Sequence, residues 1–207
     1  MTDERRIDRM GGCACMGKLM LGIAGLGLLC LIGFQKCSPS EDWPDGKWVQ
    51  TKHLLKDLRT AIATFKIEYN HLPITGANSI NSDLSLRSRG TMLPALIGLK
   101  VGELNPKEIK FIDLPPARER KRGLWQDGNE WVLSDPWGET YYIVIDTNGD
   151  SKLTNPEFGA DQSDPKYAAK CRYIPPPSTL PASVIVYSSG PDRDPKTWND
   201  NICSWRN

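Results

Sequence analysis

Two loops rich in Asp and Asn hold most of the side chains in this sequence that could do chemistry. Each follows residues typical of a β-strand: the first runs from Asp146 to Glu157, and the second lies between Gly190 and Trp205. Their carboxylate and amide oxygens are the hard ligands that calcium prefers, whereas zinc sites need clustered His or thiolate ligands. The two loops therefore predict a calcium-binding protein.

The first loop matches much of the twelve-position calcium loop of EF-hand proteins. Lys152 offers its carbonyl, and side-chain oxygens stand at the expected positions in Asp146, Asn148, Asp150 and Glu157. Ser151 replaces the glycine of the sharp turn, and a strand rather than a helix enters the loop, so a paired EF-hand is excluded. The alternative is an Asx-rich hairpin whose side chains accept hydrogen bonds from their own backbone.

The second loop has no recognised ligand spacing. It offers main-chain carbonyls and the side-chain oxygens of Asp192, Asp194, Asn199 and Asp200. On composition alone, it is the weaker of the two calcium candidates.

Residues suited to catalysis are few. The only histidines are His53 and His71, which we expect at the surface or as capping residues of a helix. Ser188 precedes Gly190 by two positions, but the Gly-x-Ser-x-Gly pattern of a nucleophile turn is absent, as is a phosphate-binding glycine loop. We therefore predict a protein that is not an enzyme and has no small-molecule substrate.

Length and charge limit the function classes further. The chain has 207 residues, enough for one globular domain and an appendage. Its 26 Lys and Arg residues nearly balance its 25 Asp and Glu residues, which argues against a nucleic-acid binder. The short basic run from Arg118 to Arg122 predicts an exposed loop.

An apolar segment from Leu19 to Phe34 carries no charge. At about 1.5 Å per residue it covers most of a hydrocarbon core of about 30 Å, and we predict an uncleaved transmembrane helix. A secretory signal peptide is the alternative, although no small-residue cleavage site follows. Because the nearest cations mostly precede the segment, we expect residues 1–18 in the cytoplasm, 19–34 in the membrane, 35–47 as a linker and 48–207 as an exported head.

The predicted membrane topology also separates the cysteines into different compartments. Cys37, Cys171 and Cys203 belong to the exported part, where disulfides can form. A Cys171–Cys203 disulfide is one option, which leaves Cys37 unpaired.

The pattern of the head predicts an α+β fold. Residues Trp48 to Tyr69 form the clearest helix, with an apolar stripe at Leu54, Leu58, Ile62, Phe65 and Tyr69. We expect a second, short helix within residues 91–99, and strands at 130–133, 140–145 and 184–187. Residues 74–90 predict an irregular loop, and residues 155–181 a proline-rich excursion. One amphipathic helix then packs on a small antiparallel sheet.

Three features together resemble the major pseudopilin of type II secretion systems: the long helix, the turn Asp135-Pro-Trp-Gly138, and the tail from Val186 to Trp205. The similarity covers residues 48–205, and its specific part is the turn and the tail. It implies a pilin-like head with calcium bound between the last strand and the C-terminus. By position, the ligands would be Asp192, Asn199 and Asp200, with carbonyls near Ser189 and Thr197.

The resemblance thus ranks the second loop above the first, which reads as an insertion that could hold a second ion. It also implies the bacterial inner membrane, and other pseudopilins or secretion-apparatus proteins as partners. The segment Gly17-Lys-Leu-Met-Leu-Gly22 departs from the family pattern, because it lacks the Phe and the Glu of the processing site. The alternative is a stand-alone envelope protein whose head binds a peptide or protein partner.

Overall fold

The computed structural model describes residues 46–75, 82–160, 163, 165–170 and 174–206. The expected cytoplasmic segment and membrane span, and nearly all of the expected linker, lie outside these residues. Among the helices that are described, none has the length and apolar character needed to cross a membrane.

The longest element is the helix α1, Gly46–Tyr69. It begins two residues before the predicted start and ends at Tyr69, as predicted. The next residue, Asn70, has a positive φ of 56° and donates its N–H to the Lys66 carbonyl at 2.9 Å, which closes the last turn. The predicted stripe is partly wrong, since Leu54 and Tyr69 lie only half-buried at its edge. The buried face instead holds Thr51, Leu55, Leu58, Ala61, Ile62 and Phe65.

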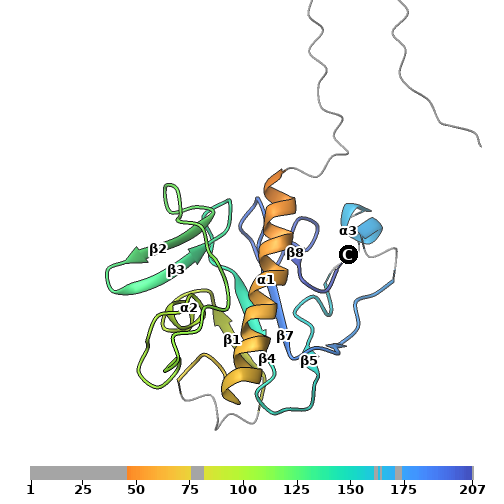
Figure 1. Ribbon diagram of the computed structural model, residues 1–207. Coiled ribbons are helices and arrows are strands. Elements are labelled where there is room, and N and C mark those ends of the chain that lie inside the picture. Colours follow the sequence, from red (N-terminus) through yellow and green to blue (C-terminus); the bar gives the residue numbers. More distant parts are fainter. Residues whose placement is uncertain (1–45, 76–81, 161–162, 164, 171–173, 207) are drawn as a thin grey trace, which may run out of the picture. The chain divides into compact units, whose positions relative to one another are not determined.

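The main sheet has four antiparallel strands in the order β1-β4-β7-β8. They are β1 (Leu84–Arg87), β4 (Tyr142–Ile145), β7 (Val184–Ser188) and β8 (Ile202–Cys203). Figure 1 shows α1 lying across this sheet, close to β7 and β8. The coarse prediction of an α+β head with a helix on an antiparallel sheet is therefore confirmed.

The strand β7 is covered on both faces of the main sheet, and its successive side chains point to opposite sides. In β7, Val184 and Val186 pack into the main core with Leu58 and Phe65 of α1. Ile185 and Tyr187 pack into two smaller clusters on the other side. A sheet buried on both faces explains why β7 is an unbroken run of buried residues.

The remaining elements flank this sheet. The hairpin of β2 (Gly123–Asp127) and β3 (Glu130–Ser134) turns at Gly128, whose φ is +60°. The pair β5 (Leu153–Thr154) and β6 (Thr179–Leu180) is shorter. The helix α2 (Met92–Leu96) supplies core residues, and α3 (Pro165–Lys170) is a single short turn of helix.

Several sequence predictions of local structure need correction. The loop predicted at residues 74–90 contains the edge strand β1, and the excursion predicted at 155–181 contains α3 and β6. The strand β2 was not predicted at all. The helix predicted at 91–99 is only five residues long, because Gly98 takes a φ of 92° that ends it.

Candidate metal-binding site

The C-terminal loop joins the last two strands of the main sheet, and its two ends are fixed by them. Ser188 pairs with Ile202 across β7 and β8. The next residues outward, Ser189 and Asn201, therefore face each other at the base of the loop. The sequence between them holds all of the tail residues that were predicted as ligands.

Hydrogen bonds bring Asp192 and Asp200 together, although they lie on opposite arms of the loop. A carboxylate oxygen of Asp200 accepts the backbone N–H of Asp192 at 3.2 Å. The Asp192 carboxylate accepts the N–H of Asp194 at 2.8 Å and the hydroxyl of Thr197. Two acidic side chains thus share one loop, where a cation would offset their mutual repulsion.

Two buried oxygens at the base of this loop have no hydrogen-bond donor within the described residues. They are Oγ of Ser189, which is fully buried, and Oδ1 of Asn201, which is 3 % exposed. The other end of the Asn201 amide donates to the Pro195 carbonyl at 3.0 Å, so the side chain reaches into the loop. An unpaired buried acceptor costs about 1–3 kcal/mol, and a bound cation would satisfy both oxygens.

Asn201 was missed by the sequence prediction, which took Asn199 and Asp200 as side-chain ligands. Both lie half-buried in the same loop, whereas Asn201 is buried. The signal that could have found Asn201 is its register: it stands directly before the apolar pair Ile202-Cys203 and therefore opposite Ser189.

The Asp194 side chain has a local role. Its carboxylate accepts the N–H of Lys196 at 2.9 Å, within an exposed turn. Among the described residues, no three His, Cys, Asp or Glu side chains gather as a metal group. Any calcium site in the tail loop must therefore combine carboxylates with amide, hydroxyl or carbonyl oxygens, as calcium sites commonly do.

In the loop that follows β4, Asx side chains accept hydrogen bonds from their own backbone, but β4 and β5 do not pair with each other, so the loop is not a hairpin. The two carboxylate oxygens of Asp146 accept the N–H groups of Gly149 at 2.6 Å and of Ser151 at 2.9 Å. Asn148 and Asp150 each accept the N–H two residues further on, at 3.0 and 2.8 Å. Ser151 takes the left-handed φ of 59° that a glycine would otherwise supply.

Glu157, predicted as the last ligand of that first loop, lies elsewhere in the structure. Its buried carboxylate accepts hydrogen bonds from Tyr167 at 2.9 Å and from the indole of Trp205 at 3.0 Å. Arg206 lies 3.4 Å from the same carboxylate. The structure thus joins Glu157 to the C-terminal tail, and does not group it with Asp146 and Asp150.

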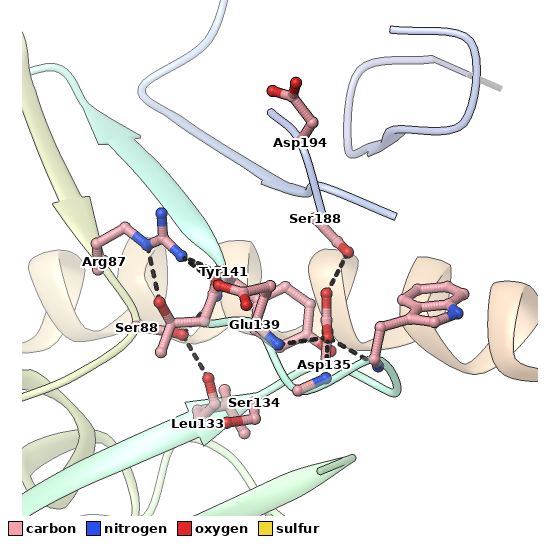
Figure 2. A network of polar contacts seen from close by, with 12 residues as sticks. Arg87, Ser88, Leu133, Ser134, Asp135, Glu139, Tyr141, Ser188 and Asp194 are labelled. Atoms are coloured by element: carbon pink, nitrogen blue, oxygen red, sulfur yellow. Dashed lines mark hydrogen bonds and ion pairs between the residues drawn. The ribbon is translucent and has the colours of Figure 1, made fainter. Parts of the chain in front are cut away.

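The turn that carried the resemblance is built around Asp135, which is fully buried (Figure 2). One carboxylate oxygen accepts the N–H groups of Trp137, Gly138 and Glu139 at 2.8–2.9 Å. The other accepts the hydroxyl of Ser188 at 2.6 Å. Burial raises the pKa of Asp135 above its ordinary value, although these hydrogen bonds oppose the shift.

The predicted Cys171–Cys203 disulfide involves Cys171, which lies outside the described residues. Cys203 is buried in β8, and burial raises the pKa of its thiol to about 12. The Arg206 guanidinium lies 3.1 Å from its sulfur.

No protein-family model, no curated protein and no solved structure matches this chain.

Proposed function

We propose that this protein is a membrane-anchored structural protein of the pseudopilin type, which displays a calcium-stabilised head outside the cytoplasm. It would act in a type II secretion or type IV pilus-like apparatus of the bacterial inner membrane. Other pseudopilins or proteins of that apparatus would be its partners. The anchor in this proposal is the apolar segment at residues 19–34.

The observation that carries the proposal is the pair of buried, unsatisfied oxygens of Ser189 and Asn201. They lie at the base of the same loop whose arms bring Asp192 and Asp200 together. In the proposal, calcium binds between these arms and is held by side-chain oxygens of Asp192, Asp200, Asn201 and Ser189, with Asn199 as a further candidate. Carbonyls near Ser189 and Thr197 complete the oxygen ligands.

The arrangement of the head supports the same proposal. The long helix α1 precedes a four-stranded antiparallel sheet, and the loop in question joins the last two strands. A pilin-like head implies this order of helix, sheet and calcium loop. Calcium would then stabilise the head by mass action, since it binds the folded loop and not the unfolded chain.

Thermal unfolding of the full-length protein tests the proposal. At a calcium concentration of about 100 times Kd, binding adds about 2.7 kcal/mol, which corresponds to a rise in Tm of about 5–10 °C over the protein in chelator. Asp200→Asn should abolish this rise. Asp146→Asn removes a carboxylate from the other loop and should keep it. Equal melting temperatures in calcium and in chelator would show that the head is not stabilised by calcium, and would contradict the proposed site.

A groove beside α1 favours the second candidate, a stand-alone envelope protein with a peptide or protein partner. The groove has a volume of about 630 Å³ and lies between α1 and the loop that leads to β2. Its apolar lining comes from Val49, Leu54, Pro115, Pro116 and Pro136. Mass spectrometry of the native N-terminus separates the candidates: a processed, methylated start supports the pilin pathway, and an intact Met1 supports the stand-alone anchor.

A further inference from the structure

The hydroxyl of Ser188 links two segments that are far apart in the sequence. It donates to the Asp135 carboxylate at 2.6 Å, and its oxygen accepts the backbone N–H of Gly190 at 3.1 Å. All three groups are buried. Ser188 therefore ties the first turn of the C-terminal loop to the Asp-Pro-Trp-Gly turn that follows β3 (Figure 2).

Asp135 is a rigid anchor for this link. Three consecutive backbone N–H groups hold its other carboxylate oxygen, and its own carbonyl accepts the N–H of Arg122 at 2.8 Å. None of these partners belongs to the C-terminal loop. The position of the Asp135 carboxylate is thus set independently of whether the loop holds an ion.

Gly190, whose position is fixed by the hydrogen bond to Ser188, packs against Asp200. Its φ of 70° lies in the left-handed region, and a Cβ at this position would stand 2.6 Å from the Asp200 carbonyl oxygen. The same Cβ would stand 3.1 Å from a carboxylate oxygen of Asp200. The backbone of Gly190 is therefore packed directly against Asp200, and a displacement of one moves the other.

We propose that Asp135 and Ser188 are positioning residues of the calcium loop. Neither one contacts the ion. They fix the backbone at Gly190, and Gly190 fixes the distance between Asp200 and the start of the loop. This inference rests on the proposed function, because it assigns these residues a role toward the calcium that the C-terminal loop would bind.

Loss of the link should weaken calcium binding more than it weakens the fold. Groups that orient metal ligands from outside the coordination sphere typically change metal affinity by about 10-fold to 100-fold. Ser188→Ala removes both hydrogen bonds of the hydroxyl, so we expect the Kd for calcium to rise by about 10-fold or more.

A matched control is available in Ser88, another fully buried serine that bridges two segments. Its hydroxyl donates to the Leu133 carbonyl at 2.6 Å and accepts the N–H of Tyr141 at 2.7 Å. Ser88→Ala therefore removes the same number of buried hydrogen bonds as Ser188→Ala. Neither hydrogen-bond partner of Ser88 belongs to the C-terminal loop. Ser88→Ala should therefore leave the Kd for calcium within about 2-fold of wild type.

The experiment is calorimetric titration of the full-length protein, and of the two variants, with calcium chloride. A Kd that rises about 10-fold in Ser188→Ala but not in Ser88→Ala supports the inference. Equal Kd values in wild type and Ser188→Ala, or equal losses in both variants, overturn the inference and leave the proposed function intact. A wild type that binds no calcium overturns the proposed function and the inference together.

A second measurement needs only the calcium-free wild type, and applies if Ser188→Ala does not fold. Hydrogen exchange of the Gly190 amide should be slow without calcium, because Asp135 holds its acceptor in place. Exchange of Gly190 as fast as that of the exposed residue Arg193 would show that the link does not order the loop, and would overturn the inference.

Discussion

The carboxylate of Glu157 and the guanidinium of Arg206 lie 3.4 Å apart, and only 2 % of the Glu157 side chain is exposed. This contact, with the bond from Trp205 to the same carboxylate, fastens the end of the chain to the segment after β5. The tail that closes the candidate calcium loop is therefore held by the buried carboxylate of Glu157.

Glu157→Gln should destabilise the head by about 1–3 kcal/mol, because a neutral amide replaces the buried, charged acceptor of the Tyr167 and Trp205 hydrogen bonds. Urea unfolding of the full-length protein measures this loss. Glu130→Gln is the control, since it breaks the exposed pair with Arg89 and should change stability little. Equal losses in the two variants would contradict a structural role for the Glu157 contact.

The packing of α1 makes a second prediction. Leu58 is fully buried in the main core, and Leu58→Ala should cost about 2–5 kcal/mol through lost burial and the cavity left behind. Ile67 lies on the same helix but is 82 % exposed, so Ile67→Ala should stay within about 0.5 kcal/mol of wild type. Urea unfolding measures the stability of both variants. A large loss of stability in Ile67→Ala would contradict the exposure of this face of α1.

The backbone at Gly190 makes a third prediction, tested with a matched glycine. Gly149 has a φ of 79° and Gly190 one of 70°, but only Gly190 has atoms within reach of an added Cβ. Each Gly→Ala change costs about 1–2 kcal/mol for the left-handed backbone. Gly190→Ala should in addition lose the rise of Tm in calcium, whereas Gly149→Ala should keep it. Retention of that rise in Gly190→Ala would contradict the close packing on Asp200.

The titration of Asp135 makes a fourth prediction. Burial raises its pKa above the ordinary value of 3.8, so the folded protein binds this proton more tightly than the unfolded chain does. Its contribution to stability is full below pH 3.8 and is lost as pH rises through the higher pKa of the folded protein. Asn at this position does not titrate. The stability of wild type relative to Asp135→Asn should therefore be greater at pH 4 than at pH 7, and a constant difference across that range would contradict the shift.

The sequence predicted those parts of the fold that carry a clear period. The helix α1 could be read because its apolar residues recur at helical spacing over many residues, and β7 because it is a β-branched run that leads to a Gly-Pro turn. The strand β1 could not, since Leu84–Arg87 is short and pairs with β4, which lies far away in the sequence. The strand β2 pairs with β3, its neighbour along the chain, but Gly123–Asp127 is short and lacks a strict alternation of apolar and polar residues.

Some residues of the candidate site could be predicted from the sequence, and others could be found only in the structure. Composition nominated Asp192, Asp194, Asn199 and Asp200, and the resemblance selected Asp192, Asn199 and Asp200 as ligands. Of these, the structure joins Asp192 and Asp200 by a hydrogen bond. The choice of Asn201 needed the register of β7 and β8, which depends on contacts between distant residues. The position of Glu157 also depends on such contacts, because its spacing matched a calcium loop while its partners Trp205 and Arg206 lie at the chain end.

The most direct test of the calcium site is a crystal of the full-length protein grown with calcium, with anomalous scattering used to locate the ion. We predict a peak inside the C-terminal loop, about 2.3–2.6 Å from the side-chain oxygens of Asp192, Asp200 and Asn201. A crystal with no peak in this loop, or with its peak at Asp146 and Asp150, would contradict it.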